Sequence, residues 1–412
     1  MSYGAGIDLG TTFTSAAVSA SGRTRMVPLS PDLIVPSVAF QTTGTGLFTG
    51  AAAAQAAETD PVGVARSFKR RLGDPSPLVL RGRSHSAAAL MAAQLRDVLA
   101  EIAGHMGGPP ESIVLTCPAI WGPYRRRHFA EVPRLAGVQS FRMITEPEAA
   151  ATHYTAERRL GDGEVVAVYD LGGGTFDTTI LRMCWGGTEI LGTPEGVEHM
   201  GGIDFDDTLQ AHVDDRLDGA VSDLDPADPT ALAALAQIRA ECVRAKEDLS
   251  VEQIVTLTVP LPSGRQEVTV TREQFEDMIR PSVQLTIEAM RRTISSAGLS
   301  TDKLSAVLLT GGSSRIPLVS HLVSEEFGKP VRVTLHPKFT VALGAAAIAA
   351  GPAVAVPAPV VPQPAPVAAP DPVVTMAAVP AAAPATNRRW LVLAAAVLAV
   401  VVVIAVALAL AA

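Results

Sequence analysis

The chain has 412 residues, 48% of them hydrophobic, which is enough material for two domains that each bury a core. Its formal net charge of -8 argues against a nucleic-acid-binding surface, because such surfaces usually carry clustered lysine and arginine. The cysteines show no CxxC spacing and the histidines no HxxxH or HExxH pair, so neither a disulfide framework nor a transition-metal site is expected. We expect Cys117, Cys184 and Cys242 to be small buried hydrophobic side chains.

The body of the chain is expected to begin at once and to extend to about residue 351. "MSYGAGIDLG" lacks the basic and apolar regions of a secretory signal, which favours a cytoplasmic start. Runs rich in β-branched residues, at 112–120 and 165–172, alternate with helical stretches such as 87–106. This alternation predicts an α/β architecture.

Two similar segments stand about 160 residues apart. "IDLGTTF" (Ile7 to Phe13) and "YDLGGGTF" (Tyr169 to Phe176) share Asp-Leu-Gly followed by Thr and Phe, with one extra glycine in the second. The repeat predicts two similar lobes, at about 1–165 and 166–351, that face each other across a cleft.

Each repeat has the composition of a strand-turn-strand hairpin that binds phosphate. Glycine turns allow backbone N–H groups to approach an anion closely, and threonine adds a hydroxyl donor. Asp8 and Asp170 precede the turns and are candidates for holding Mg²⁺ through water, because Mg²⁺ gives up its water shell reluctantly. A single glycine-rich hairpin is more often a structural turn, but two copies favour a nucleotide site. The candidate phosphate-binding residues are Gly10, Thr11 and Thr12 in the first turn and Gly172, Gly173, Gly174 and Thr175 in the second.

The composition changes after the body. Residues 352–389 are rich in Pro, Ala and Val, which predicts a semi-rigid linker that could extend to about 100 Å. Residues 390–412 form an uncharged apolar stretch that is long enough for one membrane-spanning helix, with a buried core helix as the alternative. Arg388, Arg389 and Trp390 lie on its N-terminal side, where the positive-inside rule predicts the cytoplasm. We therefore expect a single-pass membrane protein whose N-terminal domain is cytoplasmic.

Further motifs make the resemblance to a known family specific. After the two hairpins, the chain carries "TCPAIW", "ITEPEAAATHY", "GVEHMGGIDFDDTL", "ECVRAKEDLS", "LLTGGSSRIPLV" and "ALGAAAIAA". In this order they resemble the nucleotide-binding domain of the 70-kDa heat-shock chaperones, over about residues 4 to 351. The resemblance implies a two-lobed actin-like ATPase fold made of duplicated ribonuclease-H-like lobes, with ATP or ADP and Mg²⁺ as ligands. In that family a peptide-binding domain follows, whereas here the Pro/Ala-rich segment begins directly, so we expect no such domain.

The resemblance also implies a catalytic set. By motif position, Lys69, Glu146 and Asp170 correspond to the family's groups that arrange and activate the attacking water. These residue types suit phosphoryl transfer, which relies on positioning and on stabilisation of developing charge. The alternatives are a solvated cationic face for Lys69, which precedes Arg70 and Arg71, and a helix start favoured by the dipole for Glu146.

The remaining implied contacts surround the nucleoside. Arg315 is expected to stack on the base, with a surface ion pair as its alternative. Three positions depart from the pattern that the resemblance implies: Val243 replaces an acid, Glu247 replaces an arginine that covers the other face of the adenine, and Lys338 replaces an acid. These changes leave the base preference open. The other implied contacts are Gly201 and Gly202 to phosphate, Lys246 and Ser250 to ribose, and Gly311, Gly312 and Ser313 close to the nucleoside.

Three functions are consistent with the sequence. The first is a membrane-anchored ATPase that hydrolyses ATP slowly and couples lobe closure to an unidentified protein partner. The second is a nucleotide-sensing interaction module without hydrolysis, and the third an actin-like filament former. The basic stretch from Arg125 to His128 is either a relay to such a partner or a solvated helix start.

Overall fold

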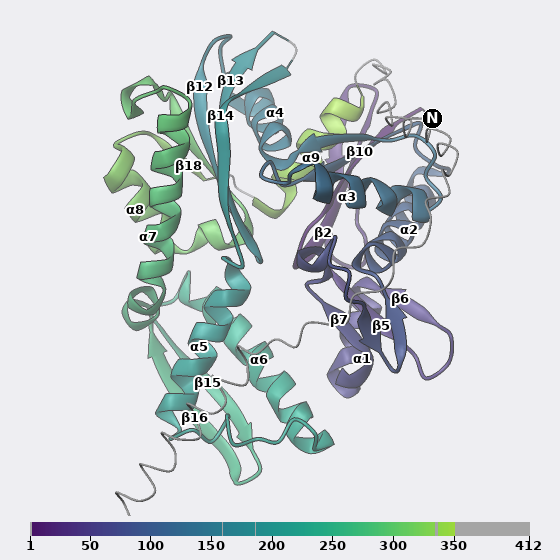
Figure 1. Cartoon of the computed structure of the whole chain (residues 1–412), viewed down its shortest axis with the longest axis vertical. Helices are drawn as coiled ribbons and strands as arrows, with labels where there is room; N and C mark the ends of the chain where they lie inside the picture. The colour runs from purple at the N-terminus through teal and green to yellow at the C-terminus, as the bar shows by residue number, and fades with distance from the viewer. Residues whose placement is uncertain (1, 159, 186, 334–336, 351–412) are drawn as a thin grey trace, which may run out of the picture. The chain divides into compact units, whose positions relative to one another are not determined.

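The computed structural model describes residues 2–158, 160–185, 187–333 and 337–350 (Figure 1). The expected linker at 352–389 and the expected transmembrane segment at 390–412 lie outside these ranges. Within them, no helix combines the length and apolar character needed to cross a bilayer.

The first sheet is built from the N-terminal part of the chain and forms the centre of what we call lobe I. Its strands are arranged in the order β11-β10-β1-β2-β3, with β4 also pairing with β2. β1 is parallel to β10, which is parallel to β11, and it is antiparallel to β2. The strands are β1 (Gly4–Leu9), β2 (Phe13–Ala20), β3 (Arg23–Met26), β4 (Ile34–Pro36), β10 (Ser112–Cys117) and β11 (Arg142–Thr145).

The second sheet, at the centre of lobe II, repeats this order. It runs β14-β13-β12-β17-β18, with β12 antiparallel to β13 and parallel to β17. In each sheet, three antiparallel strands that are consecutive along the chain are followed by two parallel ones. This duplication is consistent with the expected actin-like fold. The strands are β12 (Val165–Leu171), β13 (Thr175–Cys184), β14 (Gly187–Glu198), β17 (Ala306–Thr310) and β18 (Val331–Val333).

The helices have recognisable start and stop signals. α2 (Ala87–Met106) coincides with the helix predicted at 87–106, because the Ser86 side chain accepts the N–H of Ala89 and Gly107 ends the helix at φ 77°. Other helices are α3 (Pro123–Leu135), α4 (Glu146–Arg158), α5 (Gly202–Arg216), α6 (Pro229–Leu249), α7 (Arg272–Ser296), α8 (Pro317–Phe327) and α9 (Pro337–Ala349).

Helix α9 follows the second sheet in sequence but packs on the first. It lies against β1, β2, β10 and α4 (Figure 1). The backbones come so close at two positions that only glycine fits. A Cβ on Gly344 would overlap the Ala149 carbonyl of α4, and a Cβ on Gly6 would overlap the backbone of Ala346. Small residues on both sides therefore allow α9, which follows the last strand of the second sheet, to pack closely against the first sheet and α4.

Smaller elements extend each lobe beyond its sheet. In lobe I these are α1 (Gly50–Thr59), β5 (Val38–Gln41), β6 (Leu47–Thr49), β7 (Val64–Arg66), β8 (Leu78–Leu80), β9 (Arg83–His85), the 3-10 turn η1 (Pro61–Gly63) and the 3-10 turn η2 (Phe68–Arg71). In lobe II they are the hairpin β15 (Ile254–Leu261) and β16 (Gly264–Thr271) and the 3-10 turns η3 (Thr301–Lys303) and η4 (Gly312–Arg315).

The expectation for the cysteines needs one correction. Cys117 and Cys242 are buried, but Cys184 is exposed. Cys184 pairs with Gly187 at the tip of the β13–β14 hairpin, beyond the reach of the core. Its neighbour Trp185 is 91% exposed for the same reason.

Candidate functional site

The two repeated hairpins meet. The turn between β1 and β2 (Gly10–Thr12) lies against the turn between β12 and β13 (Gly172–Gly174). A Cβ on Gly173 would overlap Thr12 Oγ1, and a Cβ on Gly174 would overlap the methyl group of Thr11. Consecutive glycines are needed here because two turns from opposite lobes occupy nearly the same space.

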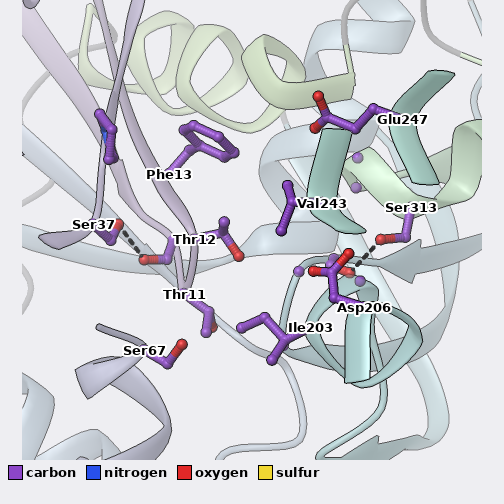
Figure 2. A pocket seen from close by; sticks show the side chains of 18 of the residues that line it. Thr11, Thr12, Phe13, Ser37, Ser67, Ile203, Asp206, Val243, Glu247 and Ser313 are labelled. Atoms are coloured by element: carbon purple, nitrogen blue, oxygen red, sulfur yellow. Dashed lines mark hydrogen bonds between the residues drawn. The ribbon is translucent and has the colours of Figure 1, made fainter. Parts of the chain in front are cut away.

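A cavity of about 850 Å³ opens beside these turns (Figure 2). Both lobes line it, and every residue that the sequence pointed to as nucleotide-binding, apart from Gly201, contributes to its wall. The lining includes Asp8, Gly10, Thr11, Thr12, Lys69, Glu146, Asp170, Gly172, Gly173, Gly174, Thr175, Gly202, Lys246, Ser250, Gly311, Gly312, Ser313 and Arg315.

Lys69 and Glu146 form a buried ion pair in the wall of the cavity. Lys69 Nζ lies 2.8 Å from Glu146 Oε1, and the two residues are 6% and 9% exposed. The Trp121 ring, 5.6 Å from the ammonium group, adds a cation–π contact. Lys69 is therefore no part of a solvated cationic face. Glu146 does begin a helix, as the alternative held, but its carboxylate also faces the lysine.

Aspartates crowd this end of the cavity, and their pKa values respond. Burial, followed by the charge of Glu146, raises the pKa of Asp8 to about 6, although Lys69 and a 2.9 Å hydrogen bond from Thr116 oppose the shift. The same two causes raise the pKa of Asp177 to about 8 and that of Asp170 well above its usual range. Burial disfavours the charged form of Lys69, but Glu146 and Asp8 outweigh it and raise the lysine pKa. The site thus crowds carboxyl groups around one ammonium group, and their raised pKa values mean that ionising them costs free energy, which a further bound cation would offset.

A hydrogen-bond network supports the second turn from within lobe II. The N–H groups of Gly202 and Ile203 donate to the carbonyls of Gly172 (3.0 Å) and Gly173 (2.8 Å), and Ser313 Oγ donates to the Gly172 carbonyl (2.9 Å). Gly201 lies so close that a Cβ there would come within 2.7 Å of the Gly174 nitrogen. The Gly202 amide, predicted to contact phosphate, is therefore engaged in holding the turn.

The Lys246 side chain also has partners within lobe II. Its ammonium lies 2.7 Å from Asp206 and donates to the Gly202 carbonyl at 3.0 Å. Burial raises the pKa of Asp206 to about 6 even though Lys246 opposes the shift. This ion pair ties α6 to the start of α5 at the edge of the cavity.

Helix α6 lines the other end of the cavity. Its apolar lining residues are Ala236, Ala240 and Val243, and its charged ones there include Arg239 and Glu247. Arg315 on η4 is exposed and lines this end of the cavity. The side chain of Lys338 lies outside the described set.

Sequence reasoning missed three residues of the site. Asp206 stands in the same "GGIDFDD" motif as the glycines. Asp177 pairs with Asp170 across the hairpin, at the place where the first repeat has Ser15, so an alignment of the repeats would have drawn attention to it. Arg70 had no local signal, because its partners are distant in sequence.

The residues present fit Mg²⁺ bound through phosphate and water. Among the described side chains, no three carboxylate, histidine or cysteine groups are arranged to ligate a metal ion by themselves. Several buried polar atoms of the cavity region lack a hydrogen-bond partner, including Thr12 Oγ1, Asp177 Oδ1 and Thr310 Oγ1. Mg²⁺ typically keeps several waters and binds one or two carboxylates plus substrate phosphates. Asp8 and Asp170 can supply those carboxylates.

Comparison with known proteins agrees with this geometry. A family profile described as "Hsp70 protein" matches residues 78–355. A chaperone protein HscA homolog from Pseudomonas putida is 35% identical over 364 residues, which cover 83% of this chain and 56% of the relative. A chaperone protein DnaK from Thermotoga petrophila is 31% identical over 364 residues, which cover 84% and 59%. The chain therefore spans somewhat more than half the length of these relatives.

Proposed function

This chain belongs to the Hsp70 family, and we propose that it binds ATP with Mg²⁺ in the cavity between its lobes and hydrolyses it slowly. One observation carries the proposal: the two glycine turns meet beside the buried Lys69–Glu146 pair and the half-buried Asp170. Polyphosphate, magnesium and water need that combination of amides, cation and carboxylates.

Each group has a distinct part in the proposed reaction. The backbone of the two turns cradles the phosphates, while Lys69 answers the negative charge that develops on the transferred phosphoryl group. Glu146, fixed by Lys69 at 2.8 Å, orients the attacking water. Mg²⁺ neutralises phosphate charge when bound, with Asp8 and Asp170 holding its water shell.

A matched pair of aspartate variants tests hydrolysis. In the full-length protein, we expect Asp170→Asn to lower single-turnover hydrolysis of radiolabelled ATP at least roughly a hundredfold, the scale seen when one stabilising group is removed from a transition state. Asp162→Asn, at an exposed turn, serves as the control for the same chemical change. Equal turnover in wild type and Asp170→Asn would refute the assignment.

Nucleotide sensing without hydrolysis is a second candidate function. Its support comes from the end of the cavity lined by α6 and Arg315, which we call the base end. There Val243 and Glu247 occupy positions that differ from the family pattern. Calorimetry that finds tight ATP binding in a protein with no measurable turnover would favour it.

We further propose that residues 390–412 anchor the protein in a membrane, with the ATPase body in the cytoplasm on the 352–389 tether. The support is the uncharged apolar composition of this segment and the preceding Arg388 and Arg389. A double change, Val402→Lys with Val403→Lys, should move the protein from carbonate-washed membranes to the supernatant. Lobe closure would then act on a protein partner at the membrane, which crosslinking in the presence of ATP or ADP can identify. Retention of the lysine variant in washed membranes would contradict the anchor.

A further inference from the structure

We propose that Arg70 is a positioning residue that anchors the phosphate turn of lobe II to lobe I and so sets how long a nucleotide stays bound; the inference rests on the proposed nucleotide binding. Arg70 follows Lys69 directly in η2, yet the two side chains serve different sides of the same turn. Lys69 lines the cavity, whereas Arg70 is absent from its lining.

The guanidinium group of Arg70 holds two parts of lobe II at once. Its Nε donates to the Gly174 carbonyl at 2.8 Å, and one terminal nitrogen lies 2.6 Å from Asp204 Oδ2 in the first turn of α5. The Arg70 side chain is only 12% exposed. The acceptors are a buried carbonyl and a partly buried carboxylate, and charge-assisted hydrogen bonds from a planar guanidinium group are among the stronger ones in proteins.

The contact with Gly174 has a directional consequence. In a trans peptide the carbonyl of one residue and the N–H of the next point in opposite directions. Because the Gly174 carbonyl accepts a hydrogen bond from Arg70, which lies outside the cavity lining, this carbonyl points away from the cavity. The Thr175 N–H therefore points toward the cavity. Gly174 and Thr175 both line the cavity, so Arg70 orients this peptide from behind.

A second arginine joins the lobes without touching either turn. Arg125 of α3 makes a two-pronged ion pair with Glu198 of β14, at 2.6 and 2.9 Å. Its side chain is 27% exposed and that of Glu198 is 46% exposed, so solvent weakens the pair. Arg125 therefore provides a matched control, because its loss also removes an ion pair between the lobes but leaves the phosphate turn intact.

The test measures release of a fluorescent ATP analogue from the full-length protein by stopped flow. We expect Arg70→Gln to accelerate release roughly tenfold to a hundredfold, the range for a lost charged hydrogen bond. Arg70→Lys keeps the positive charge but loses the planar guanidinium group that binds Gly174 and Asp204 at once, so this variant should release the analogue at an intermediate rate. Hydrolysis of ATP that is already bound should change far less than release, since Lys69, Glu146 and Asp170 remain. Arg125→Gln should release at nearly the wild-type rate.

A double-variant cycle identifies the partner. Asp204→Asn should accelerate release, and combining it with Arg70→Gln should add little, because both changes break the same contact. Wild-type release from Arg70→Gln, or equal acceleration in Arg125→Gln, would overturn the proposal. If Arg70→Gln does not fold, Arg70→Lys and Asp204→Asn carry the test, and unchanged release from both would overturn it. A wild-type protein that binds no nucleotide would instead refute the proposed function.

Discussion

The two ends of the cavity follow different rules. At the phosphate end, which is the part of the cavity around the two glycine turns, side chains are held by specific neighbours. Lys69 is buried in an ion pair with Glu146, and Gly173 lies directly against Thr12. At the base end, α6 contributes apolar alanine and valine side chains next to charged ones, and Arg315 is exposed. The difference follows from the burial of charge, because buried charged groups must each be matched by a partner, whereas apolar and exposed side chains need no such match.

The largest effect is expected from the centre of the phosphate end. Lys69→Met removes the cation and leaves Glu146 without its partner, so hydrolysis should fall by about a hundredfold to a thousandfold. Single-turnover assays at saturating ATP measure it. Lys303→Met is the control, since Lys303 is about two-thirds exposed. Hydrolysis within a few-fold of wild type would mean that the two ends of the cavity differ less than the structure indicates.

The next effect concerns the fit between the turns. Gly173→Ala would place a Cβ on Thr12 Oγ1, so the turns must separate and nucleotide affinity should fall roughly tenfold or more. Gly104→Ala offers a matched control, because a Cβ at that helix position meets nothing within 4 Å. Titration calorimetry with ADP compares them, and equal affinities would show that the contact of the turns has no role in binding.

The base end should respond in the opposite direction. Glu247→Arg restores the residue type that the family resemblance implies for stacking on the base, and we expect ATP to bind roughly threefold to thirtyfold more tightly. Affinity for inorganic triphosphate, which has no base, should stay the same. An equal change for both ligands would indicate a general effect of charge instead of base recognition.

The smallest effect is on stability and depends on pH. Because the pKa of Asp177 is raised from 3.8 to about 8, the folded protein holds a proton that the unfolded chain has lost between these values. Stability of the nucleotide-free protein should therefore fall as pH rises from about 4 to 8. Asp177→Asn should reduce this dependence and raise the Tm at pH 8 by a few degrees. Calorimetric scans at pH 6 and pH 8 check it, and a Tm difference unchanged by the substitution would contradict it.

Local sequence determined much of the fold. The helix predicted at 87–106 is α2 because Ser86 and Gly107 supply its caps within the sequence itself. The predicted strand at 165–172 corresponds to β12. The repeat around Asp8 and Asp170 predicted two similar lobes, and the structure contains two sheets of the same strand order. Periodicity, caps and glycine turns act over a few residues, so a single sequence displays them.

Only the tertiary structure decided which distant groups meet. Lys69 and Arg70 are neighbours in one basic run, yet one pairs with Glu146 in the cavity wall and the other with Asp204 behind the turn. Cys184 looked like the other two cysteines until its place at a hairpin tip exposed it. Burial, and pairing between residues far apart in the sequence, depend on how the two lobes pack. The local sequence pattern around each residue does not determine that packing.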